Sequence, residues 1–205
     1  MIVIGLTGGI GTGKSVVSDM LAEKGAVILN ADKVGHEAYE PGTEAYHDLI
    51  STFGREILDE NERIDRKKLG AIVFADPQAL QKLNQIVHPR MYKMMEERLA
   101  QLREQGVKVV VLEAAILIEA HWTPLVDQVW VVTAAEDTVV QRLVNRNNMT
   151  PEQAMARIKS QLPEAERLKH ASAVVDNNGS LAEARRQVEA LWHKIQSEPG
   201  VGGQN

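Results

Sequence analysis

The sequence contains no cysteine, which excludes disulfide bonds, thiolate metal sites and a thiol nucleophile. It also lacks an excess of basic charge: the formal net charge is -5, so neither nucleic acid nor an anionic membrane is predicted as the main partner. The apolar segment at residues 1–7 is too short to span a membrane and has no basic flank of a signal peptide. We therefore expect a cytoplasmic protein without a membrane partner, and the sequence makes no prediction of oligomeric state.

What is present is an alternation of short apolar runs and helical patterns within 205 residues. Consecutive apolar positions are typical of strands buried on both faces of a parallel sheet. The alternation therefore predicts an α/β fold, a doubly wound five-stranded parallel sheet with helices on both sides. The expected strands are residues 2–6, 26–29, 107–112, 128–133 and 171–175, and the expected helices are residues 14–24, 89–105, 136–147 and 180–197.

One segment matches a phosphate-binding loop. Residues 8–15 read Gly-Gly-Ile-Gly-Thr-Gly-Lys-Ser and fit G-x-x-x-x-G-K-[ST] between a predicted strand and a predicted helix. The glycines let successive N–H groups converge on one anion, and the helix dipole points at the same place. Lys14 is placed to reach the β- and γ-phosphates of ATP, and the Ser15 hydroxyl to bind Mg²⁺. We therefore predict ATP as co-substrate with Mg²⁺, bound by Gly8, Gly9, Gly11, Thr12, Gly13, Lys14 and Ser15.

Two helical regions without a central strand interrupt this pattern, and each follows a predicted strand. They should lie at the carboxyl edge of the sheet, where ligands bind in such folds. We predict a P-loop core at residues 1–32, 107–139 and 171–198, a helical substrate-binding insertion at 33–106, and a mobile lid at 140–170. Residues 199–205 are rich in glycine and polar groups, which predicts a flexible tail.

Among P-loop proteins, the alternatives are a kinase, a GTPase switch and a motor-type or regulatory ATPase. Residues 176–179 satisfy D-x-x-G, but they follow the last predicted strand and the sequence has no N-K-x-D motif, so we interpret them as a turn. Glu113, after the apolar residues 109–112, fits the water-positioning acid of an ATPase and does not discriminate by itself.

Asp32 is the candidate catalytic base of a kinase. It ends the second predicted strand, and a position beside the P-loop strand would bring its carboxylate next to the γ-phosphate. A carboxylate there orients a substrate hydroxyl and accepts its proton. The alternative is an N-cap for the helix that follows.

Arg142 and Arg146 are spaced i, i+4 and share one face of the helix predicted at 136–147. Arginines in a closing lid can clamp the transferring phosphoryl group, so both are candidate ATP-binding residues and Arg142 a candidate catalytic one. The alternative is a solvated helix face.

The chain resembles the dephospho-coenzyme A kinase family over nearly its whole length. The matching residues are 6–15, 31–32, 40–42, 64–66, 69, 73–74, 83–84, 88–89, 142–143, 146, 154, 157–158, 161, 177 and 179.

The resemblance implies a P-loop kinase core with a helical coenzyme-binding domain and a lid. It implies transfer of the ATP γ-phosphoryl group to the ribose 3′-hydroxyl of dephospho-CoA, with Asp32 as base and residues 11–16, including Val16, at ATP. We count Thr7, Asp32, His88 and Glu113 as candidate substrate-binding residues, with helix-entry packing beside Pro89 as the alternative for His88.

The chain departs from the family pattern in four places. Asn30 stands where an acid is usual, Val16 where a threonine is frequent, and Ser172 where an aspartate is common before the last strand. Residues 115–119 read Ala-Ile-Leu-Ile-Glu in place of Pro-Leu-Leu-Phe-Glu. The departures leave Lys14, Ser15 and Asp32 in place but leave the roles of Asn30 and Glu119 open. Another P-loop kinase of a nucleoside or small metabolite, or a P-loop regulatory NTPase, is the alternative function.

Overall fold

The computed structural model describes residues 1–147 and 149–197, and the tail predicted for 199–205 lies outside these residues. The chain forms two compact units. The first comprises Met1–Asn30 and the described residues from Gln101 onward, and the second is Ala31–Ala100. No helix in the described part of the chain is long and apolar enough to cross a membrane.

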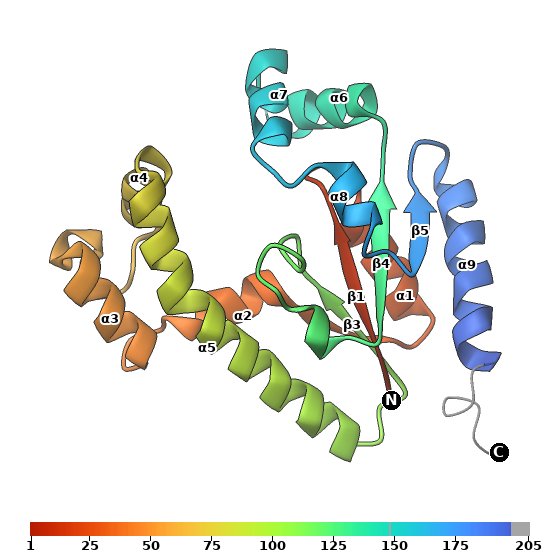
Figure 1. The fold of residues 1–205 in the computed structure, drawn as a ribbon, viewed down its shortest axis with the longest axis horizontal. Helices are drawn as coiled ribbons and strands as arrows, with labels where there is room; N and C mark the ends of the chain where they lie inside the picture. Colours follow the sequence, from red (N-terminus) through yellow and green to blue (C-terminus); the bar gives the residue numbers. More distant parts are fainter. Residues whose placement is uncertain (148, 198–205) are drawn as a thin grey trace. The chain divides into compact units, whose positions relative to one another are not determined.

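The first unit contains a five-stranded, all-parallel sheet (Figure 1), which confirms the predicted fold class. Its central strand is almost fully buried, as its consecutive apolar residues predict. The strand order is β2-β3-β1-β4-β5. The strands are β1 (Ile2–Gly8), β2 (Val27–Asn30), β3 (Val109–Glu113), β4 (Gln128–Thr133) and β5 (Ala173–Asp176).

The position expected for the second strand was wrong, because β3 lies between β2 and β1. The register pairs Leu6 of β1 with Glu113 of β3, and Glu113 in turn with Asn30 of β2. Burial follows this order: the first four residues of β3 are buried, whereas three of the four residues of the edge strand β2 are only partly buried. Because β3 neighbours β1, the acid beside the P-loop strand is Glu113.

The helices of the first unit pack into two separate apolar clusters. Helices α1 (Lys14–Glu23) and α9 (Leu181–Ser197) contact each other and pack on the sheet. Helices α6 (Glu136–Asn147) and α7 (Pro151–Lys159) form a smaller cluster beyond β4, followed by α8 (Glu164–Leu168). The short helix η2 (Thr123–Leu125) precedes β4. The smaller cluster comprises Ala134, Val139, Leu143 and Ala154, with Ile10, Val140, Met149 and Ile158 packed against it.

The second unit is helical, apart from one antiparallel bridge between Leu58 and Ile64. Its helices are α2 (Ala31–Ala38), α3 (Glu44–Phe53), η1 (Arg55–Ile57), α4 (Arg66–Ala75) and most of α5 (Pro77–Glu104).

The start expected for α5 at residue 89 was wrong, because Pro89 lies inside the helix. A proline inside a helix removes one backbone donor, but the helix continues through it here. The sequence around the observed start of α5 does carry the residues typical of a helix N-terminus. Asp76 accepts from the Gln78 N–H at 2.9 Å, and Pro77 occupies the first helical position.

Candidate active site

Two glycines give the P-loop its shape. Gly11 and Gly13 have φ angles of 73° and 96°, which side chains rarely adopt. A Cβ on Gly13 would lie 2.1 Å from the Asn177 amide nitrogen. The glycine spacing of the motif therefore reflects backbone geometry and crowding as well as phosphate binding.

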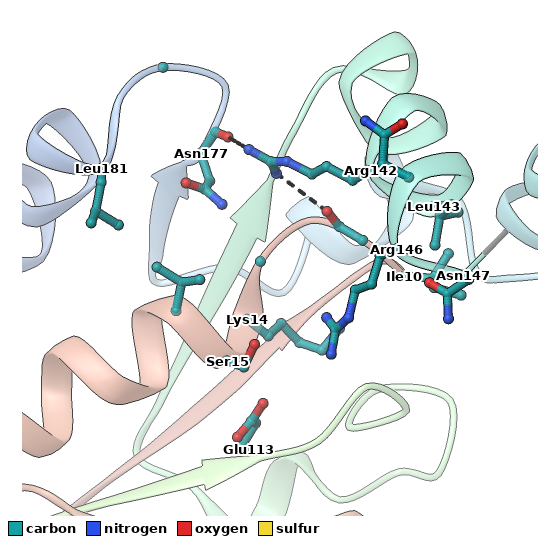
Figure 2. Close-up of a pocket in the computed structure, with 15 residues that line it drawn as sticks. Ile10, Lys14, Ser15, Glu113, Arg142, Leu143, Arg146, Asn147, Asn177 and Leu181 are labelled. Carbon is teal, nitrogen blue, oxygen red and sulfur yellow. Dashed lines mark hydrogen bonds between the residues drawn. The ribbon is translucent and has the colours of Figure 1, made fainter.

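The loop opens onto a cavity of about 710 Å³ in the first unit (Figure 2). Its wall combines the P-loop, the end of β3, helix α6 and the segment after β5. This is the carboxyl edge of the sheet, where ligands bind in doubly wound folds. The lining residues are Ile10, Gly11, Gly13, Lys14, Ser15, Val16, Glu113, Arg142, Leu143, Asn145, Arg146, Asn147, Asn177, Gly179 and Leu181.

Lys14 and Ser15 both face this cavity, as the motif predicts. The Lys14 ammonium donates to the carbonyl oxygens of Gly8 at 2.8 Å and Gly9 at 3.0 Å. Ser15 is an exposed residue. The positive charge and the oxygen donor thus lie at the N-terminus of α1, where a polyphosphate would be bound.

The two arginines of α6 both line the cavity but differ in burial and in hydrogen bonding. Arg142 is half-buried, and its guanidinium donates to the carbonyls of Gly11 and Thr12, each at 3.3 Å, and of Asn177 at 2.8 Å. Arg146 is exposed and makes no hydrogen bond or ion pair with any residue that the structure describes. The solvated-face alternative therefore does not describe Arg142, which holds the loop.

Asn177 is a site residue to which sequence reasoning gave no role. It is buried, and its side-chain amide donates to the Thr12 carbonyl at 2.8 Å. Its own carbonyl is the one that accepts from Arg142. The D-x-x-G segment is a turn as expected, with Asp176 accepting from the Asn178 N–H at 2.8 Å, and it also forms a wall of the cavity. The sequence feature that could have identified Asn177 as a site residue is its position directly after the fifth predicted strand.

Glu113 supplies the carboxylate of this cavity and accepts from the Asn30 side chain at 3.1 Å. With the Ser15 hydroxyl it offers the oxygen ligands that Mg²⁺ prefers. No group of three or more His, Cys, Asp or Glu among the described residues could hold a metal ion. Because Mg²⁺ in kinases is held largely by substrate phosphates and one or two protein oxygens, these residues fit a nucleotide-bound Mg²⁺.

A second cavity, of about 380 Å³, lies in the helical unit and contains Asp32. Asp32 is the second residue of α2, so it neither ends a strand nor caps the helix, and its carboxylate accepts no hydrogen bond from a described residue. Other lining residues are Gly35, His36, Tyr39, Leu69, Leu83, Asn84, Val87, His88 and Met91.

Burial shifts three titratable groups in this cavity. It lowers the pKa of His88, which lies inside α5 and not at a helix entry. It also lowers the pKa of His36, with a further contribution from the Arg66 charge, and raises the pKa of Tyr39. Neutral imidazoles near neutral pH make this a site of uncharged hydrogen-bonding groups around one carboxylate.

Four residues predicted at the substrates do not line either cavity. Thr7 is fully buried, and its hydroxyl donates to the Ala115 carbonyl at 3.3 Å, so it has no surface for substrate contact. Thr12 is also buried and donates to the Gly9 carbonyl at 2.9 Å. Gly8 and Gly9 instead present their carbonyls to Lys14. These four residues therefore stabilise the conformation of the loop and its surroundings through internal hydrogen bonds.

Comparison with known proteins agrees with this geometry. The family model described as dephospho-CoA kinase matches residues 2–183. The chain belongs to the dephospho-CoA kinase family. Among curated relatives, the dephospho-CoA kinase of Geobacter sulfurreducens is 44% identical over 194 residues, covering 95% of this chain and 98% of the relative. That of Geobacillus kaustophilus is 47% identical over 189 residues, covering 92% and 94%.

A solved structure, the dephospho-CoA kinase from Campylobacter jejuni, superposes with a TM-score of 0.72 at 26% identity, covering 94% of this chain and 96% of that one. The chain is thus a P-loop kinase, an ATP-dependent transferase, and the GTPase and regulatory ATPase alternatives are not supported.

Proposed function

We propose that this chain transfers the γ-phosphoryl group of Mg²⁺-bound ATP to the ribose 3′-hydroxyl of dephospho-CoA, giving CoA and ADP. The observation that carries the proposal is the cavity in which Lys14 and Ser15 meet at a glycine-rich loop, in a chain of this family. Because ATP is the phosphoryl donor, we also propose that the reaction takes place in the cytoplasm.

In the nucleotide cavity, the Lys14 ammonium leaves the Gly8 and Gly9 carbonyls for the β- and γ-phosphates when ATP binds. The free N–H groups of the loop and the dipole of α1 act on the same phosphates. Arg146 has no competing partner among the described residues and offsets the charge of the transferring group. Arg142 keeps the loop and the segment after β5 in place.

Ser15 and Glu113 would hold Mg²⁺ together with the phosphates of ATP, Glu113 directly or through a water. The ion would offset the negative charge of the phosphates during transfer. Asn30 donates to Glu113 and so fixes the direction of its carboxylate. This gives Asn30 a positioning role that fits the loss of the usual acid.

Asp32 is the proposed base. Its carboxylate orients the 3′-hydroxyl and takes its proton while the bond from the hydroxyl oxygen to the γ-phosphorus forms and the bond to the β-phosphate oxygen breaks. The other groups of the second cavity, His88 among them, are proposed to bind dephospho-CoA. Residues 140–170 are proposed to close over ATP as a lid.

A coupled ADP-release assay tests the proposal, with dephospho-CoA, nucleosides or buffer alone added to enzyme, ATP and Mg²⁺. ADP should appear with dephospho-CoA, and mass spectrometry with phosphorus NMR should place the new phosphate on the 3′-oxygen. Chelation of Mg²⁺ should stop the reaction. ADP release in buffer alone would indicate a regulatory NTPase, and release with nucleosides only another metabolite kinase.

A further inference from the structure

One peptide group of the P-loop is held from outside the loop. The N–H of Ile10 donates to the side-chain oxygen of Gln161 at 2.7 Å. Gln161 follows α7 and is separated from Ile10 by 151 residues in sequence. Its contact is with the backbone, so it depends on the conformation of the loop and not on the side chain of residue 10.

The other end of the same peptide group organises the loop internally. The Gly9 carbonyl accepts from the Thr12 hydroxyl at 2.9 Å, the Thr12 N–H at 3.4 Å and the Lys14 ammonium at 3.0 Å. The plane of the peptide from Gly9 to Ile10 therefore determines where Thr12 and Lys14 lie. Since Gln161 holds the N–H of this plane, it resists the rotation that would turn the carbonyl away from Lys14.

The side chains of Gln161 and Arg167 both lie close to Gly9. Gly9 has no side chain, and a Cβ there would lie 3.5 Å from the Gln161 oxygen and 3.6 Å from the Arg167 guanidinium. Arg167 is itself buried and donates to Glu119 at 3.0 Å. This ion pair with the partly exposed Glu119 ties α8, which follows Gln161 in the chain, to the loop after β3.

The bond between Gln161 and Ile10 uses an amide other than those of Gly11 and Gly13, which stay free to bind phosphate. The amides of Gly11 and Gly13 donate to no described residue, whereas those of Ile10 and Thr12 are occupied. The side chain of Ile10 packs against the cluster of α6 and α7. Residue 10 is therefore held by both its side chain and its N–H, and Gly11 and Gly13, whose amides are free of described partners, line the nucleotide cavity.

We propose that Gln161 is a positioning residue for nucleotide binding: it fixes the peptide between Gly9 and Ile10 so that the loop holds Lys14 and its free amides ready for phosphate. The proposal rests on the proposed function only in that the P-loop binds a nucleotide. It also connects the lid segment directly to the phosphate site.

The test replaces Gln161 by methionine, which keeps the length and removes the acceptor. Isothermal titration should show ADP binding weakened about 5- to 10-fold, the change expected for one lost hydrogen bond. The KM for ATP should rise by a similar factor, while kcat at saturating ATP stays within about twofold of wild type. Hydrogen exchange at the Ile10 amide should become faster than in wild type.

Gln153→Met is the matched control, because Gln153 accepts from the Thr150 N–H at 2.9 Å in the same lid segment without touching the loop. Gln161→Glu keeps an acceptor and should retain slow exchange at Ile10. Equal ADP affinity in Gln161→Met and wild type, or equal weakening in Gln153→Met, would overturn the proposal. If wild type binds ADP but does not phosphorylate dephospho-CoA, only the proposed function fails.

Discussion

The nucleotide cavity and the Asp32 cavity are built by different kinds of contact. In the first, Arg142 and Asn177 bond to loop carbonyls that are 130 and 165 residues away in sequence. In the second, the lining residues come from α2 and the turn after it, from α4 and from α5, and the carboxylate of Asp32 accepts no hydrogen bond from a described residue. Residues of the first cavity therefore shape the site besides their proposed role in binding the nucleotide, whereas we expect that Asp32 can be altered with little effect on the fold.

The largest effect is expected for Lys14→Ala. The substitution removes the charge placed for the β- and γ-phosphates, and turnover should fall about 10³- to 10⁵-fold, the range for a charge-neutralising group at the transferred phosphoryl. The thermal midpoint should change far less than turnover, because the Lys14 hydrogen bonds to the Gly8 and Gly9 carbonyls contribute only about 1 kcal/mol each to stability. Steady-state rates and melting curves are the measurements, with Lys24→Ala at the opposite end of α1 as control. Near-normal turnover would refute the phosphate assignment.

Asp32→Asn should separate chemistry from structure in the second cavity. The amide keeps the shape but accepts no proton, so turnover with dephospho-CoA should fall about 10²- to 10⁴-fold. ADP affinity and the unfolding midpoint should match wild type, because the P-loop and the helix α2 are intact. Calorimetry and denaturant titration measure these two quantities. A rate within about threefold of wild type, far below that range, would direct the search for a base to Glu113.

The sequence predicted the parts of the structure that are coded locally. The pattern at 136–147 gave helix α6 with its observed bounds, and the motif at 8–15 gave the loop with Lys14 and Ser15 in one cavity. Strand order was not coded in the same way, because β2 and β3 carry similar apolar runs and only their degree of burial separates edge from interior.

The contacts of Asn177 and Gln161 were also beyond prediction. Each is a single side chain that bonds to the backbone of a distant residue, Thr12 for one and Ile10 for the other. Such bonds create no periodicity and need no particular residue at the acceptor or donor position. The motif located the loop, but the segments that hold it in shape could be found only from the fold.

Within the first cavity, the two arginines of α6 allow a structural role to be compared with a role in phosphoryl transfer. Arg142→Lys keeps the charge but cannot reach three carbonyls at once, so ADP affinity should fall about tenfold and the thermal midpoint by a few degrees, as for one or two lost hydrogen bonds. Arg146→Lys should lower kcat several-fold, with an unchanged midpoint, because Arg146 holds no described residue. If both variants melt like wild type, Arg142 has no structural role.

The smallest effect concerns the pH dependence of stability, and it arises in the second cavity. Burial lowers the pKa of His88 from its ordinary value of 6.5, so below that pH the unfolded chain binds more protons than the folded one. The stabilisation from neutral His88 is therefore complete above the ordinary pKa and is lost as pH falls toward the folded value. His36, whose pKa is lowered by burial and then by Arg66, acts in the same direction.

Urea unfolding of wild type and His88→Asn at about pH 7.5 and about pH 5.5, on either side of the ordinary histidine value, tests this contribution. Wild type should lose more stability than the variant between the two pH values. The carboxylates with lowered pKa, at Glu23, Asp65, Glu152 and Glu183, titrate below this window and do not contribute. His193→Asn, on the exposed face of α9, is the control and should keep the wild-type slope. An equally steep loss in His88→Asn would show that burial of this imidazole does not favour its neutral form.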